Sequence, residues 1–213
     1  APDNLKVGAK AIPALGLETT LYELDIHKHR NNDCYYHIGF AYEIASILNR
    51  KVKLPDMSYK TNDDDVSNYL SLEVDTPKCP YYTGRMATNL TIKESPEFIK
   101  KRLLAAGMHP INNVVDISNY VMLEFGQPLH FFDKDTLGEK ILVRNAYEDE
   151  KLVTLDNNER TLKTSDIVIT DGKKPICLAG VMGGLDTEVT SRTKNIFMEA
   201  AIFDNISIIP LID

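Results

Sequence analysis

The sequence predicts an α+β fold in which mixed β-sheets are layered with a few helices, after a small partial helical module at the N-terminus. Short apolar segments separated by turn residues fill the second half of the chain, up to the stretch NIFMEAAIF at 195–203. Such spacing is typical of β-strands. Amphipathic helical patterns occur in three places, and no internal repeat is found. Helices and strands that do not alternate regularly favour the α+β class.

Composition limits the possible functions. The chain has 213 residues, 43% of them hydrophobic, which suffices for one large domain or for one domain and part of another. A net charge of -7 opposes nucleic-acid binding unless a local basic face or a partner subunit supplies the contact. No apolar run approaches the roughly 20 residues that span a bilayer, and no signal-peptide pattern opens the chain. The start at Ala1 rather than Met suggests a piece of something longer.

The cysteines predict a reducing compartment. Three of them occur, far apart and without a CxxC pair: Cys34, Cys79 and Cys177. A disulfide framework or a structural zinc site is therefore not expected, and a cytoplasmic location fits best.

The first 54 residues are predicted to form the partial module. Thr20–Ile26 is expected to be a strand, followed by an amphipathic helix over 34–49 with Asp33 as its N-cap. The helical face is set by apolar residues three and four apart: Ala41, Ile44, Ala45 and Leu48.

Two polar stretches could bind a metal, but a solvated surface is the alternative for each. His27, His29 and His37 lack an acidic or thiolate complement, which favours a solvated basic turn. The acidic run TNDDD at 61–65 lacks the Gly and the downstream Glu of a calcium loop. This run lies in a predicted linker at 55–75, and a second domain is expected over 76–213.

The second domain is predicted to open with a strand and a helix. CPYYTGRMATNLTI reads as strand material, and Ser95 is expected to cap a helix that ends at Gly107. The apolar face of this helix would consist of Ile99, Leu103 and Ala106.

The stretch NVVDISNYVMLEFGQPLHFFD at 113–133 is expected to carry the site. Val114 and Val115 would form a buried strand, and Asp116 would begin a short helix that ends at Gly126. A turn at Gln127-Pro128 then leads to His130. Two interpretations of His130 stay open: it is a buried core residue, or its imidazole belongs to a binding pocket. Strands are predicted beyond it at 140–144, in a hairpin over 152–162 that turns at Asp156–Asn158, and in DIVITD, PICLAGVMGG and NIFMEAAIF.

Two further features could join His130. Gly183 and Gly184 follow a predicted strand, where glycines let backbone N–H groups approach a ligand but also simply form turns. Glu199 lies among apolar strand residues, where burial of a carboxylate is costly unless it is hydrogen-bonded or binds a ligand. A strand-end position facing water is the alternative for Glu199.

Four segments of the chain carry a specific family resemblance. The segments CPYYTGR, GMHPINNVVDISNYVMLEFGQPLHFFD, LAGVMGG and NIFMEAAIF resemble, in order and spacing, the central editing domain of the bacterial phenylalanyl-tRNA synthetase beta subunit. The preceding LDIHKHRNNDCYYHIGFAYEIASIL resembles the segment that leads into that domain. The resemblance covers nearly the whole chain.

This resemblance implies a set of site residues. The family's Thr in the D-x-TNYV motif falls on Ser118, its His on His130, its pocket Gly on Gly183 and its tyrosine-reading Glu on Glu199. A family Arg falls on His109, which is shorter and often neutral. In the family, a further segment that forms one wall of the pocket lies beyond the position of Phe203. This chain instead ends SIIPLID, so that wall is expected to be missing and the domain to be truncated at its C-terminal end.

The implied activity is hydrolysis of tyrosine wrongly esterified to tRNA(Phe), with His130 and Ser118 in catalytic roles and Glu199, Gly183 and His109 binding substrate. We expect His130 and Ser118 to place water or ribose, not to form a nucleophilic pair, since no orienting acid is identifiable. The alternative is a non-catalytic tRNA-docking or scaffold module with decayed editing. The parent enzyme would use ATP and Mg²⁺ with its alpha subunit, whereas no cofactor, metal or membrane is expected for this segment.

Overall fold

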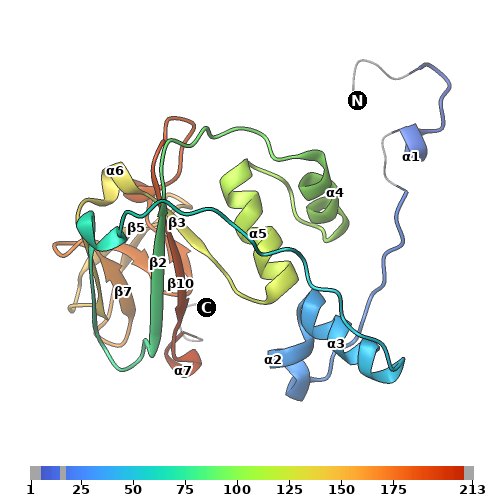
Figure 1. Ribbon diagram of the computed structural model, residues 1–213. Coiled ribbons are helices and arrows are strands. Elements are labelled where there is room, and N and C mark those ends of the chain that lie inside the picture. Colours follow the sequence, from blue (N-terminus) through green and yellow to red (C-terminus); the bar gives the residue numbers. More distant parts are fainter. Residues whose placement is uncertain (1–5, 15–17, 209–213) are drawn as a thin grey trace. The chain divides into compact units, whose positions relative to one another are not determined.

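The computed structural model describes residues 6–14 and 18–208 of the chain, which fall into two compact units (Figure 1). Unit 1 comprises Ala1–Lys53 and Glu94–Gly126, and unit 2 comprises Leu54–Lys93 and Gln127–Asp213. The predicted domains, with a module over 1–54, a linker over 55–75 and a second domain over 76–213, stay a prediction.

Unit 2 contains the β-structure. Its three-stranded antiparallel sheet has the order β2 (Tyr81–Ala87), β10 (Ile196–Ile202) and β3 (His130–Asp133), with β2 and β10 side by side in Figure 1. The five-stranded sheet has the order β1 (Ser71–Asp75), β4 (Lys140–Asn145), β7 (Ile167–Thr170), β8 (Pro175–Leu178) and β9 (Met182–Gly183). Because β1 and β4 pair in parallel while the other neighbours are antiparallel, this sheet is mixed.

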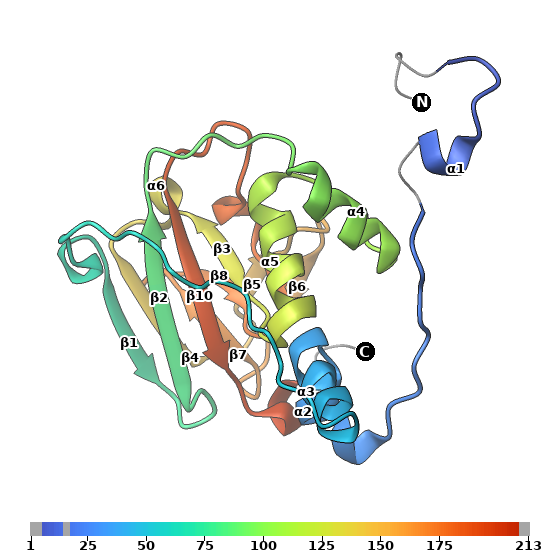
Figure 2. The same ribbon diagram turned by 45° about the vertical axis from the view of Figure 1, so that its right-hand side comes forward.

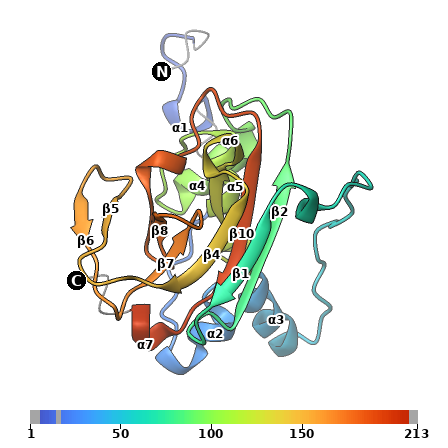
Figure 3. The same ribbon diagram turned by 90° about the vertical axis from the view of Figure 1, so that its left-hand side faces the viewer.

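The described part of unit 2 also contains a hairpin and four short helices. The hairpin of β5 (Lys151–Val153) and β6 (Glu159–Thr161) lies on the opposite side of unit 2 from β1 and β2 (Figure 3). The short helices are η2 (Val66–Asn68), α6 (Lys134–Leu137), η3 (Leu185–Thr187) and α7 (Asn205–Ile208). These elements and the sheets confirm the predicted α+β class.

The main core of unit 2 is formed by side chains from both large sheets. Phe132 and Phe197, from the three-stranded sheet, are 0% and 1% exposed and pack in one cluster with Ile141, Val143, Ile169 and Ile176 of the other sheet. Strand β2 alternates exposed and half-buried residues, so Tyr82, Gly84 and Met86 face inward. The site described below lies on this inner face.

Unit 1 is helical. Its described elements are α1 (Ala11–Ala14), η1 (Lys28–Arg30), α2 (Asn31–Cys34), α3 (His37–Ile47), α4 (Glu97–Ala105) and α5 (Asn113–Phe125). Helices α4 and α5 lie side by side (Figure 2) and bury Ile99, Leu103 and Val114. The Ser95 hydroxyl donates to the buried Asp116 carboxylate at 2.5 Å, which joins the start of α4 to α5.

The predicted strand at Val114-Val115 is wrong, because both residues lie in the first turn of α5. The Asn112 side chain accepts hydrogen bonds from their two backbone N–H groups at 3.0 Å and so caps the helix four residues earlier than Asp116 would. The predicted end at Gly126 is confirmed, since this residue has φ 77° and its N–H bonds the Met122 carbonyl.

Other predicted caps and one strand are also wrong. Thr20–Ile26 forms no strand. Asp33 lies inside α2 and pairs with Arg30, and Tyr36 precedes α3, so the predicted helix over 34–49 is interrupted at 35–36. Pro96, not Ser95, stands at the N-cap of α4, because the Ser95 hydroxyl is used by Asp116.

Candidate functional site

Glu199 lies in the middle of the three-stranded sheet. It is on the central strand β10 and pairs in register with Gly84 of β2 and with His130 of β3. Residues directly opposite in an antiparallel pair share a face of the sheet, so Glu199 and His130 point to the same side. Glu199 is 6% exposed, which excludes the strand-end position facing water.

A phenol holds this buried carboxylate. Tyr82 lies two residues from Gly84 on the same face of β2, and its hydroxyl donates to Oε2 of Glu199 at 2.9 Å. Burial raises the pKa of Glu199 to about 7, while the hydrogen bond from Tyr82 acts in the opposite direction. Burial and the nearby carboxylate raise the pKa of Tyr82, so its hydroxyl stays protonated and remains a donor.

His130 is an uncharged imidazole at neutral pH. Burial lowers its pKa to about 4. Its ring stands edge-on to Phe132, with the two centroids 4.4 Å apart. The imidazole can therefore accept or donate one hydrogen bond to a water or hydroxyl without placing a positive charge in the site.

Gly183 is the surface against which this imidazole packs. A Cβ at Gly183 would lie 2.5 Å from Cε1 and 2.9 Å from Nε2 of His130. The strand that carries it, β9, is held by β8 through the Cys177–Gly183 pair and by the N–H of Leu155, which donates to the Gly183 carbonyl at 3.0 Å. The absence of a side chain at this position is therefore what lets β9 approach His130.

Unit 2 thus brings together three of the residues predicted from the sequence: His130, Gly183 and Glu199. Ser118, on α5, and His109, exposed in the loop before α5, belong to unit 1. The roles assigned to all five stay predictions.

Sequence reasoning missed Tyr82, Gly84 and Cys177 as neighbours of Glu199. The charge of Glu199 contributes to a raised pKa at Cys177, behind burial as the main cause, which places this thiol near the carboxylate. The alternation in CPYYTGRMA could have shown that Tyr82 and Gly84 share a face. The pairing with Glu199, 117 residues away, has no local signal.

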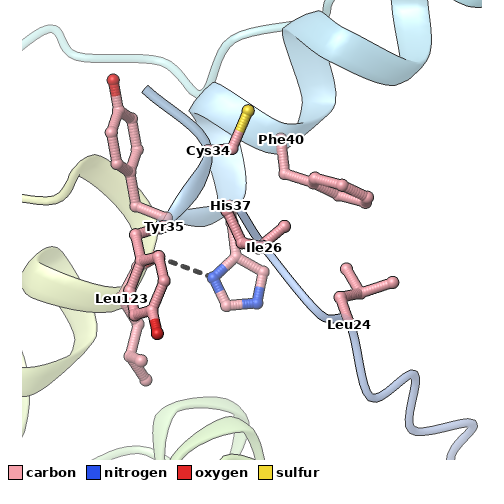
Figure 4. Close-up of a pocket in the computed structure, with 8 residues that line it drawn as sticks. Leu24, Ile26, Cys34, Tyr35, His37, Phe40 and Leu123 are labelled. Atoms are coloured by element: carbon pink, nitrogen blue, oxygen red, sulfur yellow. Dashed lines mark hydrogen bonds between the residues drawn. The ribbon is translucent and has the colours of Figure 1, made fainter. Parts of the chain in front are cut away.

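The described part of unit 1 has a cavity of another character. It measures about 330 Å³ and is lined mainly by apolar and aromatic side chains, including Leu24, Phe40 and Leu123 (Figure 4). Nδ1 of His37 donates to the Leu123 carbonyl oxygen at 2.7 Å, because a carbonyl only accepts. The imidazole of His37 is therefore hydrogen-bonded to the backbone of α5. Among the described residues, no group of three or more potential metal ligands lies together.

The site has a pH signature that stability measurements can detect. The folded state binds the Glu199 proton more tightly than an unfolded chain does, so ionisation of Glu199 lowers stability as pH rises from about 4.5 to 7. We expect Glu199→Gln to remove this loss. Relative to the wild type, the free energy of unfolding of the variant should therefore rise by on the order of 1–3 kcal/mol between pH 4.5 and 7. Urea unfolding at several pH values measures the difference.

His130→Gln gives the matched experiment of opposite sign. The unfolded chain binds the imidazole proton more tightly, so His130 lowers stability as pH falls from about 6.5 to 4. The free energy of unfolding of this variant should therefore rise relative to that of the wild type as the pH falls. A stability difference that stays constant with pH in either variant would contradict burial of that group.

Comparison with known proteins gives three findings. A family model described as the B3/4 domain matches residues 78–210. The chain is 48% identical over 204 residues to the phenylalanine–tRNA ligase beta subunit of Geobacillus kaustophilus, covering 95% of this chain and 25% of that protein. The beta subunit of Staphylococcus haemolyticus is 47% identical over 207 residues, covering 96% and 26%. The chain therefore spans about a quarter of the length of the curated relatives it matches.

A solved structure is also similar. It is the crystal structure of an N-terminal fragment of the phenylalanyl-tRNA synthetase beta subunit from Pyrococcus horikoshii, with a TM-score of 0.49 and 17% identity. The match covers 86% of this chain and 56% of that one. In the part of the chain that the structure describes, no helix has the length and apolar character needed to cross a membrane.

Proposed function

Because this chain belongs to the B3/4 domain family, whose model covers residues 78–210, we propose that it is the editing segment of a phenylalanine–tRNA ligase beta subunit. In this proposal, it hydrolyses the ester of tyrosine wrongly attached to tRNA(Phe) and spares the phenylalanine ester. The two amino acids differ by one phenolic hydroxyl, so the site must detect that group.

One observation carries the proposal: the buried carboxylate of Glu199 already accepts a hydrogen bond from a phenol. A carboxylate has acceptor capacity for about four hydrogen bonds, so a substrate hydroxyl can join that of Tyr82. A site that must hydrogen-bond a substrate hydroxyl rejects the analogue without it by roughly 10⁴–10⁵-fold. Phenylalanine would leave part of the carboxylate buried without its partner.

Hydrolysis itself requires little of the protein, because the aminoacyl ester is already activated. A positioned water and stabilisation of the tetrahedral oxyanion suffice. In this proposal His130, uncharged at neutral pH, orients the attacking water or the terminal ribose. Close packing against Gly183 fixes the position of this imidazole, and in this proposal Ser118 and His109 contact the end of the tRNA.

The wider enzyme supplies the rest of the reaction. We propose that the parent protein works in the cytoplasm with an alpha subunit, binds tRNA(Phe), and attaches phenylalanine with ATP and Mg²⁺ at sites outside this segment. Contacts with tRNA would then draw on basic surfaces of other parts of that enzyme, given the net charge of -7 here.

Deacylation of Tyr-tRNA(Phe) by the complete ligase tests the proposal. The wild type is expected to release tyrosine much faster than phenylalanine, and His130→Ala to slow release of tyrosine by about 100-fold, the lower range for a lost proton-transfer or orienting group. His29→Ala, which removes an exposed imidazole in unit 1, is the matched control and should act as the wild type. A wild-type enzyme that does not hydrolyse Tyr-tRNA(Phe) would favour a docking or scaffold role.

A further inference from the structure

Tyr82 is a residue to which the family resemblance assigned no role, yet it contacts the central group of the site. Its ring packs against the main core of unit 2, and its hydroxyl reaches Glu199 from the neighbouring strand. The preceding residue, Tyr81, points to the other face of β2 and is 57% exposed. The two adjacent tyrosines therefore offer an internal comparison.

We propose that Tyr82 is a positioning and specificity-determining residue, whose hydroxyl holds the Glu199 carboxylate in the orientation and ionisation state that read the hydroxyl of a tyrosyl substrate. This inference rests on the proposed editing function. It deepens that function by assigning the substrate preference to a pair of residues and not to Glu199 alone.

The geometry gives the first reason. Tyr82 donates to Oε2 alone, so the second carboxylate oxygen is not engaged by this phenol. A carboxylate on a strand can rotate about its last side-chain bond, and a fixed partner on one oxygen restricts where the other oxygen points. A phenol fixed by core packing is a rigid donor, since its position depends on two torsion angles only.

The electrostatic surroundings give the second reason. The titratable groups that face Glu199 from the packed elements are Tyr82 on β2, His130 on β3, Cys177 on β8 and Cys79 just before β2. Burial raises the pKa of both thiols and lowers that of His130, so these groups are uncharged at neutral pH. With no cation among them to favour the ionised carboxylate, the donor hydrogen bond from Tyr82 has that effect.

An ionised carboxylate only accepts hydrogen bonds, whereas a protonated carboxyl group also donates. Loss of the Tyr82 hydroxyl therefore shifts Glu199 toward the protonated form, which reads a phenol less selectively. The preference for tyrosine should weaken most at low pH and recover in part as pH rises.

Tyr82→Phe in the complete ligase tests the inference, with Tyr81→Phe as the matched control. The quantity to measure is the ratio of kcat/KM for Tyr-tRNA(Phe) to that for Phe-tRNA(Phe). We expect Tyr82→Phe to lower this ratio by at least about 10-fold, mainly through a higher KM for the tyrosyl ester, while Tyr81→Phe leaves it unchanged. A partly unfolded variant loses both activities equally, so the ratio does not depend on the folded fraction.

A double variant separates positioning from general packing. In a Glu199→Gln background the ratio is already low, and Tyr82→Phe should lower it no further, because Tyr82 acts through the carboxylate. An unchanged ratio in the single Tyr82→Phe variant, or an equal additional loss in the Glu199→Gln background, would overturn the inference. If the wild type does not discriminate at all, the proposed function itself fails, and this result differs from both of those.

Discussion

Under the proposed editing function, replacement of Glu199 by alanine is expected to lower the preference of the complete ligase for tyrosyl over phenylalanyl esters of tRNA(Phe) by at least about 100-fold. The carboxylate is the buried acceptor of the site, and alanine leaves nothing to receive a substrate hydroxyl. The hydroxyl of Tyr82 would also lose its partner in the sheet, at a cost of about 1–3 kcal/mol of stability. Deacylation rates of the two charged tRNAs, measured in parallel, give the preference.

Met198→Ala is the matched control, because this residue is the neighbour of Glu199 on β10 and points to the other face of the sheet. It should retain the preference of the wild type. Equal loss in both variants would show that damage to β10, not the missing carboxylate, is responsible. Full discrimination by Glu199→Ala would mean that another group reads the hydroxyl.

Gly84→Ala is expected to destabilise unit 2 by about 2–4 kcal/mol. A Cβ at this position would lie 2.0 Å from Cζ and 2.4 Å from Cε2 of Phe197, and Phe197 is 1% exposed within the main core. The ring therefore has no free space into which to move, and β2 must separate from β10 or the core must shift. Urea unfolding of the wild type and the variant measures the difference.

A double-mutant cycle shows whether this overlap is the cause. Phe197→Leu removes the atoms that the new methyl group would meet, so the double variant should lose less stability than the two single variants together. Simple additivity would indicate that Gly84 is needed for backbone reasons instead.

Much of the β-structure could be predicted from the sequence. The strand at Lys140, the hairpin that turns at Asp156–Asn158 and the strand around Glu199 are confirmed, because alternating or apolar runs bounded by turn residues are local signals. The resemblance to the synthetase beta subunit is confirmed by 48% identity over nearly the whole chain.

The wrong predictions at Val114-Val115, Ser95 and Asp33 share a cause, which is competition between possible hydrogen-bond partners. Val114 and Val115 favour a strand by propensity, but the Asn112 side chain caps their N–H groups and begins a helix there. Ser95 and Asp33 are residue types that often cap helices. Here the Ser95 hydroxyl bonds the Asp116 carboxylate instead, and the Asp33 carboxylate pairs with Arg30. Such choices depend on which groups tertiary structure brings near.

The candidate site was predictable only in part, for a related reason. Sequence pattern and family resemblance indicated His130, Gly183 and Glu199, and the sheet register brings His130 beside Glu199. Tyr82 and Gly84 become neighbours of Glu199 only through the pairing of β2 with β10. No local pattern in CPYYTGRMA specifies that register.

The central position of β10 also determines when the site can form during synthesis. Strands β2 and β3 are made early, but they do not pair with each other, and the strand that joins them ends at Ile202. A nascent chain that has emerged from the ribosome only as far as β9 has every strand of the five-stranded sheet and no completed site. The cluster of His130, Gly183 and Glu199 should therefore assemble only once β10 has emerged, since this one strand supplies both the carboxylate and the pairing that aligns its neighbours.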